Sequence, residues 1–173
     1  MRFPLFLILL VSGALFAQDF RCDAGLRFQK TWELYWENGV EGSCSKQNIL
    51  GGHPFLSASA VSSRLGSALG SNALRQEEYL LGLGWKFRTE KRIQPYIALQ
   101  TGWFWLDVEE PMFEVLPHSS VLATFSFGSE IPVYGPFLTR IGMDYHLITG
   151  DGLQGPGSLY PLFMHTSFLV RIP

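Results

Sequence analysis

The sequence predicts an all-β protein, an antiparallel barrel that spans a membrane. Large apolar residues alternate strictly with small or charged ones along several stretches, as strands do, because successive side chains leave opposite faces. The apolar faces also carry tryptophans near the predicted strand ends, and glycines and charges occupy the opposite faces. Such a pattern is typical of a barrel whose outer face meets lipid, with aromatic belts at the two interfaces.

The first 17 residues have the features of a secretory signal peptide. Arg2 supplies the positive charge, residues 5–11 are apolar, and Ser12, Gly13 and Ala14 lead to an expected cleavage after Ala17. An uncleaved membrane anchor is the alternative, but the apolar run is short for a transmembrane helix. We therefore expect a mature chain of residues 18–173 that forms one barrel domain.

The composition agrees with an exported β protein and excludes some functions. Aromatic residues make up 14% of the chain and charged residues only 16%, and 18 residues are glycine. After residue 17 no apolar run approaches the length of a transmembrane helix. The net charge of -2 gives no reason to expect a nucleic-acid partner.

The clearest element is a hairpin at residues 78–105. Its first strand has one apolar face and one face of glycine and charge, and a polar turn at residues 89–92 leads to the second strand. The apolar face consists of Tyr79, Leu81, Leu83, Trp85, Phe87, Ile97, Leu99, Trp103 and Trp105. We expect this face to meet lipid.

Further strands are predicted at residues 55–64, 121–131, 137–148 and 162–172. A tight turn at 132–136 and longer loops at 66–76, 108–117 and 150–161 connect them. Short and long connections alternate, as periplasmic turns and extracellular loops do in membrane barrels. The last strand then ends in the periplasm.

The beginning of the mature chain allows two arrangements of strands. Seven strands are clear, and single-chain bacterial barrels usually have an even number, so one more strand is expected between Cys22 and Gly52. One arrangement has a long strand at 26–36, a turn at Asn38-Gly39 and a returning strand at 40–47. The other places the turn near residues 30–34. It would explain why Lys30 interrupts an apolar face, where it would cost roughly 2–4 kcal/mol at mid-membrane.

Cys22 and Cys44 are an even pair in an exported chain, which favours a disulfide over two free thiols. A hairpin centred on Asn38-Gly39 would set Cys44 opposite Glu33 and leave Cys22 far along the partner strand. The Cα atoms of the two cysteines would then be much farther apart than the roughly 7 Å that a disulfide allows. A hairpin centred near Glu33 would set the two cysteines opposite each other. We therefore favour the disulfide and the turn near residues 30–34 together.

The mature chain resembles the small eight-stranded outer-membrane barrels of diderm bacteria, the OmpA/OmpX-like group. The signal peptide, the alternating strands and patterns such as Leu81-Gly-Leu-Gly-Trp-Lys-Phe87 carry the resemblance. It implies an eight-stranded antiparallel transmembrane barrel with periplasmic termini, folded by the barrel-assembly machinery. Such proteins commonly end in an aromatic residue that this machinery reads, and here the last aromatic residue is Phe168.

Charged residues of both signs fall on the predicted inner face. Side chains just fill the interior of an eight-stranded barrel, and buried charges must pair. We therefore expect a salt-bridge network that plugs the lumen, centred on Arg140, Asp144 and Glu130, with a conduit or proton path as the alternative. The expected network comprises Glu78, Lys86, Arg88, Glu130, Arg140, Asp144, His146 and Arg171.

His165 and Ser167 are the weak candidates for catalysis. Some outer-membrane enzymes that remove acyl chains from lipid A use a His and a Ser two residues apart on a strand. Here the pair points to the lumen, whereas those enzymes act at the lipid-facing surface, and no third member is identifiable. The spacing of His and Cys predicts no metal site, and no motif predicts a cofactor.

The sequence thus predicts a monomeric, porin-like outer-membrane barrel with a structural or surface-interaction role. Its expected partners are outer-membrane lipid, the assembly machinery and an unidentified extracellular molecule. A lipid A-modifying acyl hydrolase is one alternative function. A soluble exported barrel that binds an apolar ligand, with its aromatic faces turned inward, is the other.

Overall fold

The computed structural model describes residues 20–31, 36–46, 51–66, 72–87, 92–108, 119–149 and 161–172. The expected signal peptide and Arg88 lie outside these ranges. No helix in the described part of the chain is long and apolar enough to cross a membrane.

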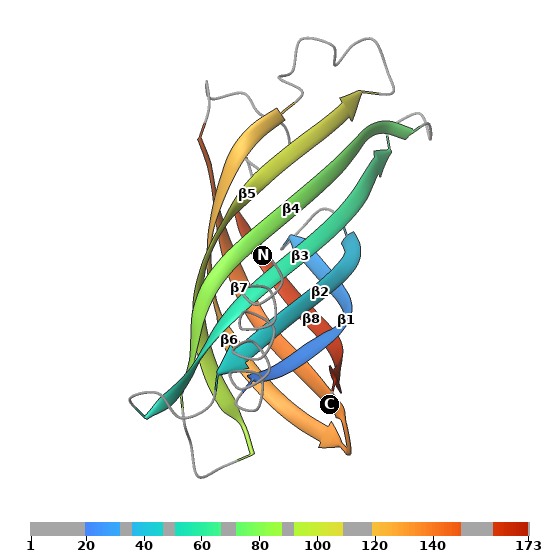
Figure 1. Ribbon diagram of the computed structural model, residues 1–173. Coiled ribbons are helices and arrows are strands. Elements are labelled where there is room, and N and C mark those ends of the chain that lie inside the picture. The colour runs from blue at the N-terminus through green and yellow to red at the C-terminus, as the bar shows by residue number, and fades with distance from the viewer. Residues whose placement is uncertain are drawn as a thin grey trace, which may run out of the picture.

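The chain forms a closed barrel of antiparallel strands in sequence order, with β1 paired to β8 (Figure 1). This confirms the predicted fold class. The strands are β1 (Phe20–Thr31), β2 (Trp36–Lys46), β3 (Gly52–Gly66), β4 (Asn72–Phe87), β5 (Gln94–Val108), β6 (Ser119–Tyr134), β7 (Phe137–Thr149) and β8 (Leu162–Ile172).

The outer surface of the barrel is apolar and the inner surface is largely polar. Leu81 and Leu83 are each 67% exposed, whereas Glu78 and Lys86 on the same strand are buried. Ile141 and Phe125 also face outward, as the alternation predicts. Aromatic side chains gather near the strand ends, with Trp36, Trp103 and Trp105 toward one rim and Phe87, Tyr134 and Phe137 toward the other.

The first hairpin follows the second of the two predicted arrangements. β1 and β2 pair with Cys22 opposite Cys44 and Lys30 opposite Trp36, and the two cysteines form a disulfide. The turn predicted at Asn38-Gly39 in the other arrangement is absent, because both residues lie inside β2. Gly39 faces inward, where a Cβ atom would come within 2.0 Å of the Ala60 carbonyl oxygen, so this glycine is required by close packing.

Several strands are longer than the sequence pattern predicts. β4 begins at Asn72, inside the loop predicted at 66–76, and β6 runs through most of the turn predicted at 132–136. Only Gly135 and Pro136 form that turn, and Gly135 has a positive φ of 56°. Continued pairing with neighbouring strands extends these elements past residues that favour turns.

The strands differ in length, which gives the barrel a stepped rim. β1 and β2 have 12 and 11 residues, whereas β4 and β6 have 16. In Figure 1 the β1–β2 hairpin stops well short of the height that β3, β4 and β5 reach. Lys30 and Trp36 therefore lie on a ledge beside a taller wall.

Candidate functional site: the charged lumen

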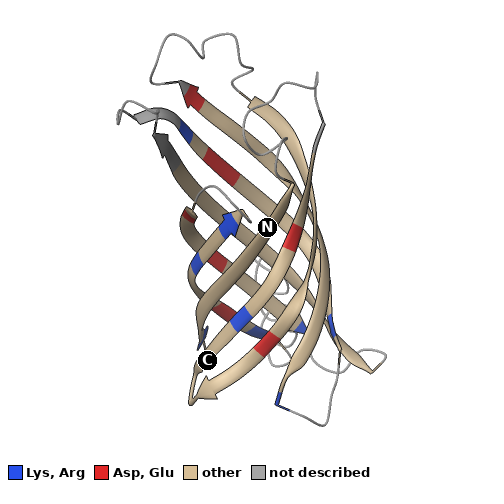
Figure 2. Cartoon of the chain, turned by 180° about the vertical axis from the view of Figure 1, so that it is seen from behind, with Lys and Arg blue, Asp and Glu red and all other residues tan. Residues whose placement is uncertain are grey.

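Buried ionisable side chains fill the interior of the barrel. Arg27, Lys86 and Arg140 are each 2% exposed, and several carboxylates beside them are equally buried. Figure 2 shows charged residues distributed along the height of the strands. Because an isolated buried charge is prohibitively costly, the arrangement depends on pairing.

At the centre of the lumen, Glu41 lies between two arginines. Arg27 Nη1 donates to Glu41 Oε2 at 3.1 Å, and Arg140 Nη1 donates to the other carboxylate oxygen. Ser167 Oγ also donates to Glu41 Oε2, at 2.6 Å. The Glu41 carboxylate therefore links β2 to β1, β7 and β8. Arg27 also forms an ion pair with Asp144 of β7.

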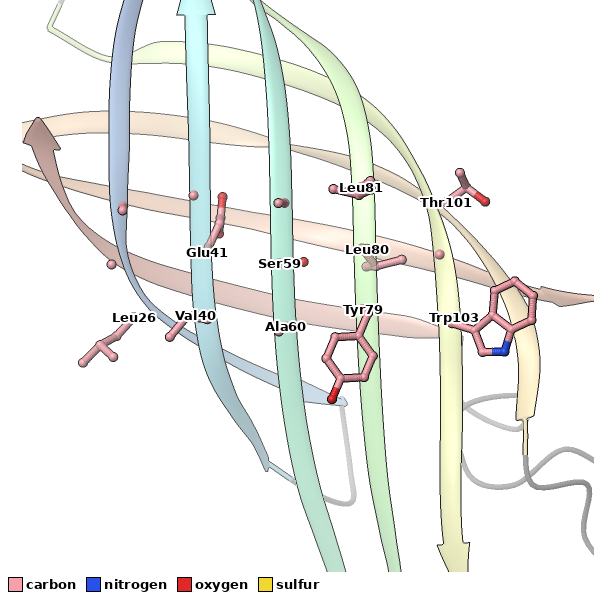
Figure 3. Close-up of a pocket in the computed structure, with 15 residues that line it drawn as sticks. Leu26, Val40, Glu41, Ser59, Ala60, Tyr79, Leu80, Leu81, Thr101 and Trp103 are labelled. Atoms are coloured by element: carbon pink, nitrogen blue, oxygen red, sulfur yellow. The ribbon is translucent and has the colours of Figure 1, made fainter.

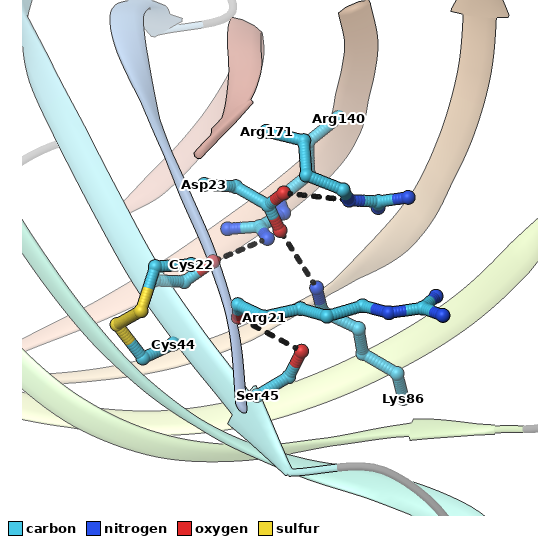
Figure 4. Close-up of a disulfide and its surroundings, with 9 residues drawn as sticks. Arg21, Cys22, Asp23, Cys44, Ser45, Lys86, Arg140 and Arg171 are labelled. Carbon is cyan, nitrogen blue, oxygen red and sulfur yellow. Dashed lines mark hydrogen bonds and ion pairs between the residues drawn. A yellow bond between two sulfur atoms is a disulfide. The ribbon is translucent and has the colours of Figure 1, made fainter. Parts of the chain in front are cut away.

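A second group of ion pairs lies at the end of the lumen next to the disulfide. Lys86 Nζ lies 2.7 Å from Glu130 Oε2 and 3.6 Å from Asp23 Oδ2, and Arg140 Nη2 donates to Glu130 Oε2 at 2.9 Å. Arg171 Nε donates to Asp23 Oδ1 at 3.2 Å (Figure 4). A small cavity of about 30 Å³ remains at this end, lined by Lys86, Glu130 and Arg171 among others.

Toward the other end, amide groups replace cations. Gln76 Nε2 donates to Glu37 Oε1 at 2.8 Å and to Glu78 Oε1 at 3.2 Å. Gln29 Nε2 likewise donates to both glutamates. His146 stacks on Phe163 with ring centroids 4.4 Å apart, and its Nδ1 lies 3.7 Å from Glu78 Oε1.

The candidate catalytic pair is engaged with other groups. His165 Nε2 lies 2.7 Å from the Tyr96 hydroxyl oxygen, and His165 Nδ1 lies 2.8 Å from Asp144 Oδ2. The Ser167 hydroxyl donates to Glu41. Both side chains are buried inside the barrel, and the geometry does not join them as a base and a nucleophile.

The predicted lumen residues occupy three kinds of position. Glu78, Lys86, Glu130, Arg140, Asp144 and His146 are buried in the lumen. The side chain of Arg171 is 36% exposed at the mouth, and Arg88 lies outside the described residues. Arg140 contacts Glu130, its expected partner, whereas Asp144 pairs with Arg27 of β1.

The network includes charged residues of the first two strands that were not predicted for it, namely Asp23, Arg27, Glu37 and Glu41, because the position of the first turn was open between two arrangements. Gln76 was predicted to lie in the loop at 66–76. The alternation of Arg27, Gln29 and Thr31 was the available signal for an inner face.

Within the described ranges, no group of three or more His, Cys, Asp or Glu side chains has a geometry that could hold a metal ion. The network of hydrogen bonds and ion pairs draws on side chains from every strand, including Ser63 of β3, which donates to Glu37 at 3.2 Å.

No family model matches the chain, and no curated protein matches it. Its fold is similar to Ail, the attachment invasion locus protein of Yersinia pestis, with a TM-score of 0.55 and 11% identity over 88% of this chain and 97% of Ail. Neisserial surface protein A (NspA) gives a TM-score of 0.54 and 12% identity over 88% of this chain and 94% of NspA. The outer membrane protein OprG from Pseudomonas aeruginosa gives a TM-score of 0.52 and 12% identity over 88% of this chain and 95% of OprG. The chain thus has the fold of small eight-stranded outer-membrane barrels.

Proposed function

We propose that the protein is a monomeric, non-enzymatic barrel of the outer membrane, with a plugged lumen and a structural or surface-interaction role. The observation that carries this proposal is the inverted distribution of side chains. Leu81, Leu83 and Leu99 stand exposed on the outer face, while Arg27 and Arg140 are buried inside. Lipid stabilises such an outer face, which would be a large aggregation liability in water.

The lumen supports a structural plug. Ion pairs and amide bridges connect Asp23 near one end to Glu78 near the other through Lys86, Arg140 and Glu41. A soluble barrel that binds an apolar ligand would have an apolar interior cavity instead. The engaged His165 and Ser167 give no support to acyl hydrolysis.

A role in surface interaction is supported by the form of the barrel and by one structural neighbour. β4, β5 and β6 carry the rim above the ledge of β1 and β2. The neighbour Ail is an attachment invasion locus protein, and it has been crystallised with the heparin analogue sucrose octasulfate. We propose that the connections at this rim face the outside of a diderm cell and meet a partner there.

Cell fractionation combined with heat modifiability tests the proposed location and fold. The full chain, expressed with its own leader in a diderm host, should enrich in the outer-membrane fraction. The unboiled protein should migrate as a compact species that shifts on boiling, and the mature N-terminus should be Gln18. A soluble periplasmic protein with no heat shift would overturn the proposal.

A further inference from the structure

The outer surface of the barrel is hollowed across β1 to β5. The hollow, called the groove here, has a volume of about 910 Å³ and is lined mainly by apolar atoms (Figure 3). Its floor consists of Gly42, Ala58 and Ala60. Leu26 and Val40 stand on one side, and Tyr79, Leu81 and Trp103 stand on the other.

The register of the strands creates the groove. Gly42 pairs with Ala58, and Val40 pairs with Ala60, so small side chains lie next to one another between β2 and β3. On the adjoining strand, Ala58 pairs with Leu81, which projects outward. Packing of the sheet does not require the glycine, because a Cβ atom on Gly42 would meet only the Asp23 carbonyl oxygen, at an ordinary 3.7 Å.

The hollow continues toward the stepped rim and becomes polar. An adjoining cavity of about 180 Å³ is lined by Ala60, Ser62, Asn38 and Glu77 among others. A further one, of about 460 Å³, is lined by Trp36, Asn38, Ser62, Ser63 and Arg75. Ala58 to Ser62 spans roughly 14 Å along the strand at about 3.4 Å per residue, close to half of the roughly 30 Å hydrocarbon core.

The polar end of the hollow carries charges of both signs. Lys30 Nζ lies 5.3 Å from the ring centroid of Trp36, on the ledge where β1 and β2 end. Arg75 forms an ion pair with Glu77, which also accepts a 2.8 Å hydrogen bond from the Tyr79 hydroxyl. Asp107 pairs with Arg75 in the register of β4 and β5. Two cations, Lys30 and Arg75, and two carboxylates, Glu77 and Asp107, therefore lie on β1, β4 and β5 toward this end of the hollow.

We propose that this surface binds a zwitterionic glycerophospholipid, an inference that rests on the proposed membrane location. One acyl chain lies along the groove over Gly42, Ala58 and Ala60. The lipid phosphate meets Lys30 and Arg75, and its amine meets the carboxylates of Glu77 and Asp107. A polyanionic head group would face those two carboxylates, and a neutral lipid would offer no negative group to Lys30 and Arg75.

Native mass spectrometry of the folded, detergent-purified protein measures this binding directly. The probes are phosphatidylethanolamine, diphosphorylated lipid A and diacylglycerol, titrated over the same range. We expect phosphatidylethanolamine to bind at least tenfold more tightly than diacylglycerol and more tightly than lipid A. Preferential binding of lipid A, or equal binding of all three, would overturn the proposed ligand.

Two variants test the two halves of the site. Ala58→Phe fills the groove and should weaken phosphatidylethanolamine binding at least tenfold. Ala123→Phe is the matched control, because Ala123 lies at the same level through the pairs Ala58–Leu81, Leu81–Thr101 and Thr101–Ala123, yet does not line the groove. Equal loss in both variants would refute the groove.

The double variant Lys30→Gln/Arg75→Gln should remove the preference for phosphatidylethanolamine over diacylglycerol. Arg92→Gln, at an exposed position outside the groove, should leave the preference intact. An unchanged preference in the double variant would refute the head-group contacts. Every variant is first assayed for heat modifiability. A protein without a heat shift does not form a barrel, which contradicts the proposed function. A protein that shows the heat shift but does not select lipid contradicts only the lipid site.

Discussion

At the scale of single residues, the two ends of the lumen network differ in how their carboxylates are compensated. Glu41 contacts two arginines, whereas Glu37 and Glu78 are bridged by the amides of Gln29 and Gln76. A carboxylate between cations stabilises the fold, and removing it leaves buried positive charge. Two adjacent carboxylates repel each other, so neutralising one should be tolerated.

Glu41→Gln should lower the free energy of unfolding by about 3–5 kcal/mol, because Arg27 and Arg140 each lose a buried charged partner. Glu78→Gln should be neutral or stabilising, since it keeps the size of the side chain and relieves repulsion with Glu37. Urea titrations in lipid bilayers, followed by tryptophan fluorescence, measure both values. Equal losses in the two variants would contradict this account.

The contact between Arg140 and Glu130 predicts a coupling that a double-mutant cycle can measure. Arg140→Ala removes one cation from Glu130, which keeps Lys86, and Glu130→Ala removes one carboxylate from Arg140, which keeps Glu41. Each single variant loses the contact between the two residues, so the double variant should lose less stability than the two single losses added together. The expected difference is about 1–3 kcal/mol, the usual range for contacting charged groups. Additive losses in the same urea assay would show that the pair is not coupled.

At the scale of strands, alternation determines which residues meet lipid. Leu83 and Ile141 face outward on β4 and β7, between the two sets of aromatic residues. The first hairpin is also held by a covalent bond, the disulfide between Cys22 and Cys44.

Leu83→Arg and Ile141→Arg should each lower the free energy of unfolding by about 2–4 kcal/mol, because arginine near the midplane loses hydration. Tyr134→Arg is the control, since Tyr134 is 83% exposed at the turn between β6 and β7, and its cost should be about 0–1 kcal/mol. Urea titration in bilayers compares the three. If the Leu83 and Ile141 variants have the same free energy of unfolding as the parent, these residues do not face lipid.

The disulfide should stabilise the first hairpin. Cys22 and Cys44 are separated by 22 residues in the sequence, and the bond joins paired positions of β1 and β2. On the chain-entropy model, Cys22→Ser/Cys44→Ser should cost roughly 3 kcal/mol. Non-reducing peptide mapping of the mature protein should recover the linked peptides, and free thiols at both positions would contradict the pairing.

At the scale of the whole molecule, a barrel of this size encloses an interior that side chains fill. The described side chains link β1, β2, β4, β6, β7 and β8 through charges, and Tyr96 of β5 joins them through His165. Closure of the barrel brings residues together that are up to 148 positions apart in the sequence, as in Arg171 and Asp23. The result is a rigid polar core inside an apolar shell.

A filled lumen predicts that the protein does not conduct ions. The purified barrel, reconstituted into a planar bilayer at neutral pH, should give no stepwise currents. A general porin inserted by the same procedure serves as the positive control. Reproducible conductance steps from the parent protein would contradict the proposed plug.

The sequence by itself determined which side chains face outward and which face inward along most strands. That information is local, because a period of two residues needs only one strand, and the facing of Leu83, Trp103 and Ile141 could be predicted from it. The disulfide and the turn near residues 30–34 were favoured together from the sequence, since a bond between Cys22 and Cys44 is incompatible with a hairpin centred on Asn38-Gly39. Asn38-Gly39 misleads as a turn signal because its glycine serves packing inside β2.

Only the tertiary structure decided which charges meet. Asp144 was expected in one network with Arg140 and Glu130, because two adjacent predicted strands carry the three residues, yet it pairs with Arg27 of β1. The hollow on the outer face likewise depends on the register that aligns Gly42 with Ala58 and Val40 with Ala60. Register and closure are set by all the strand pairs together, so contacts that cross the lumen, unlike the facing of a side chain, cannot be obtained from any one stretch of sequence.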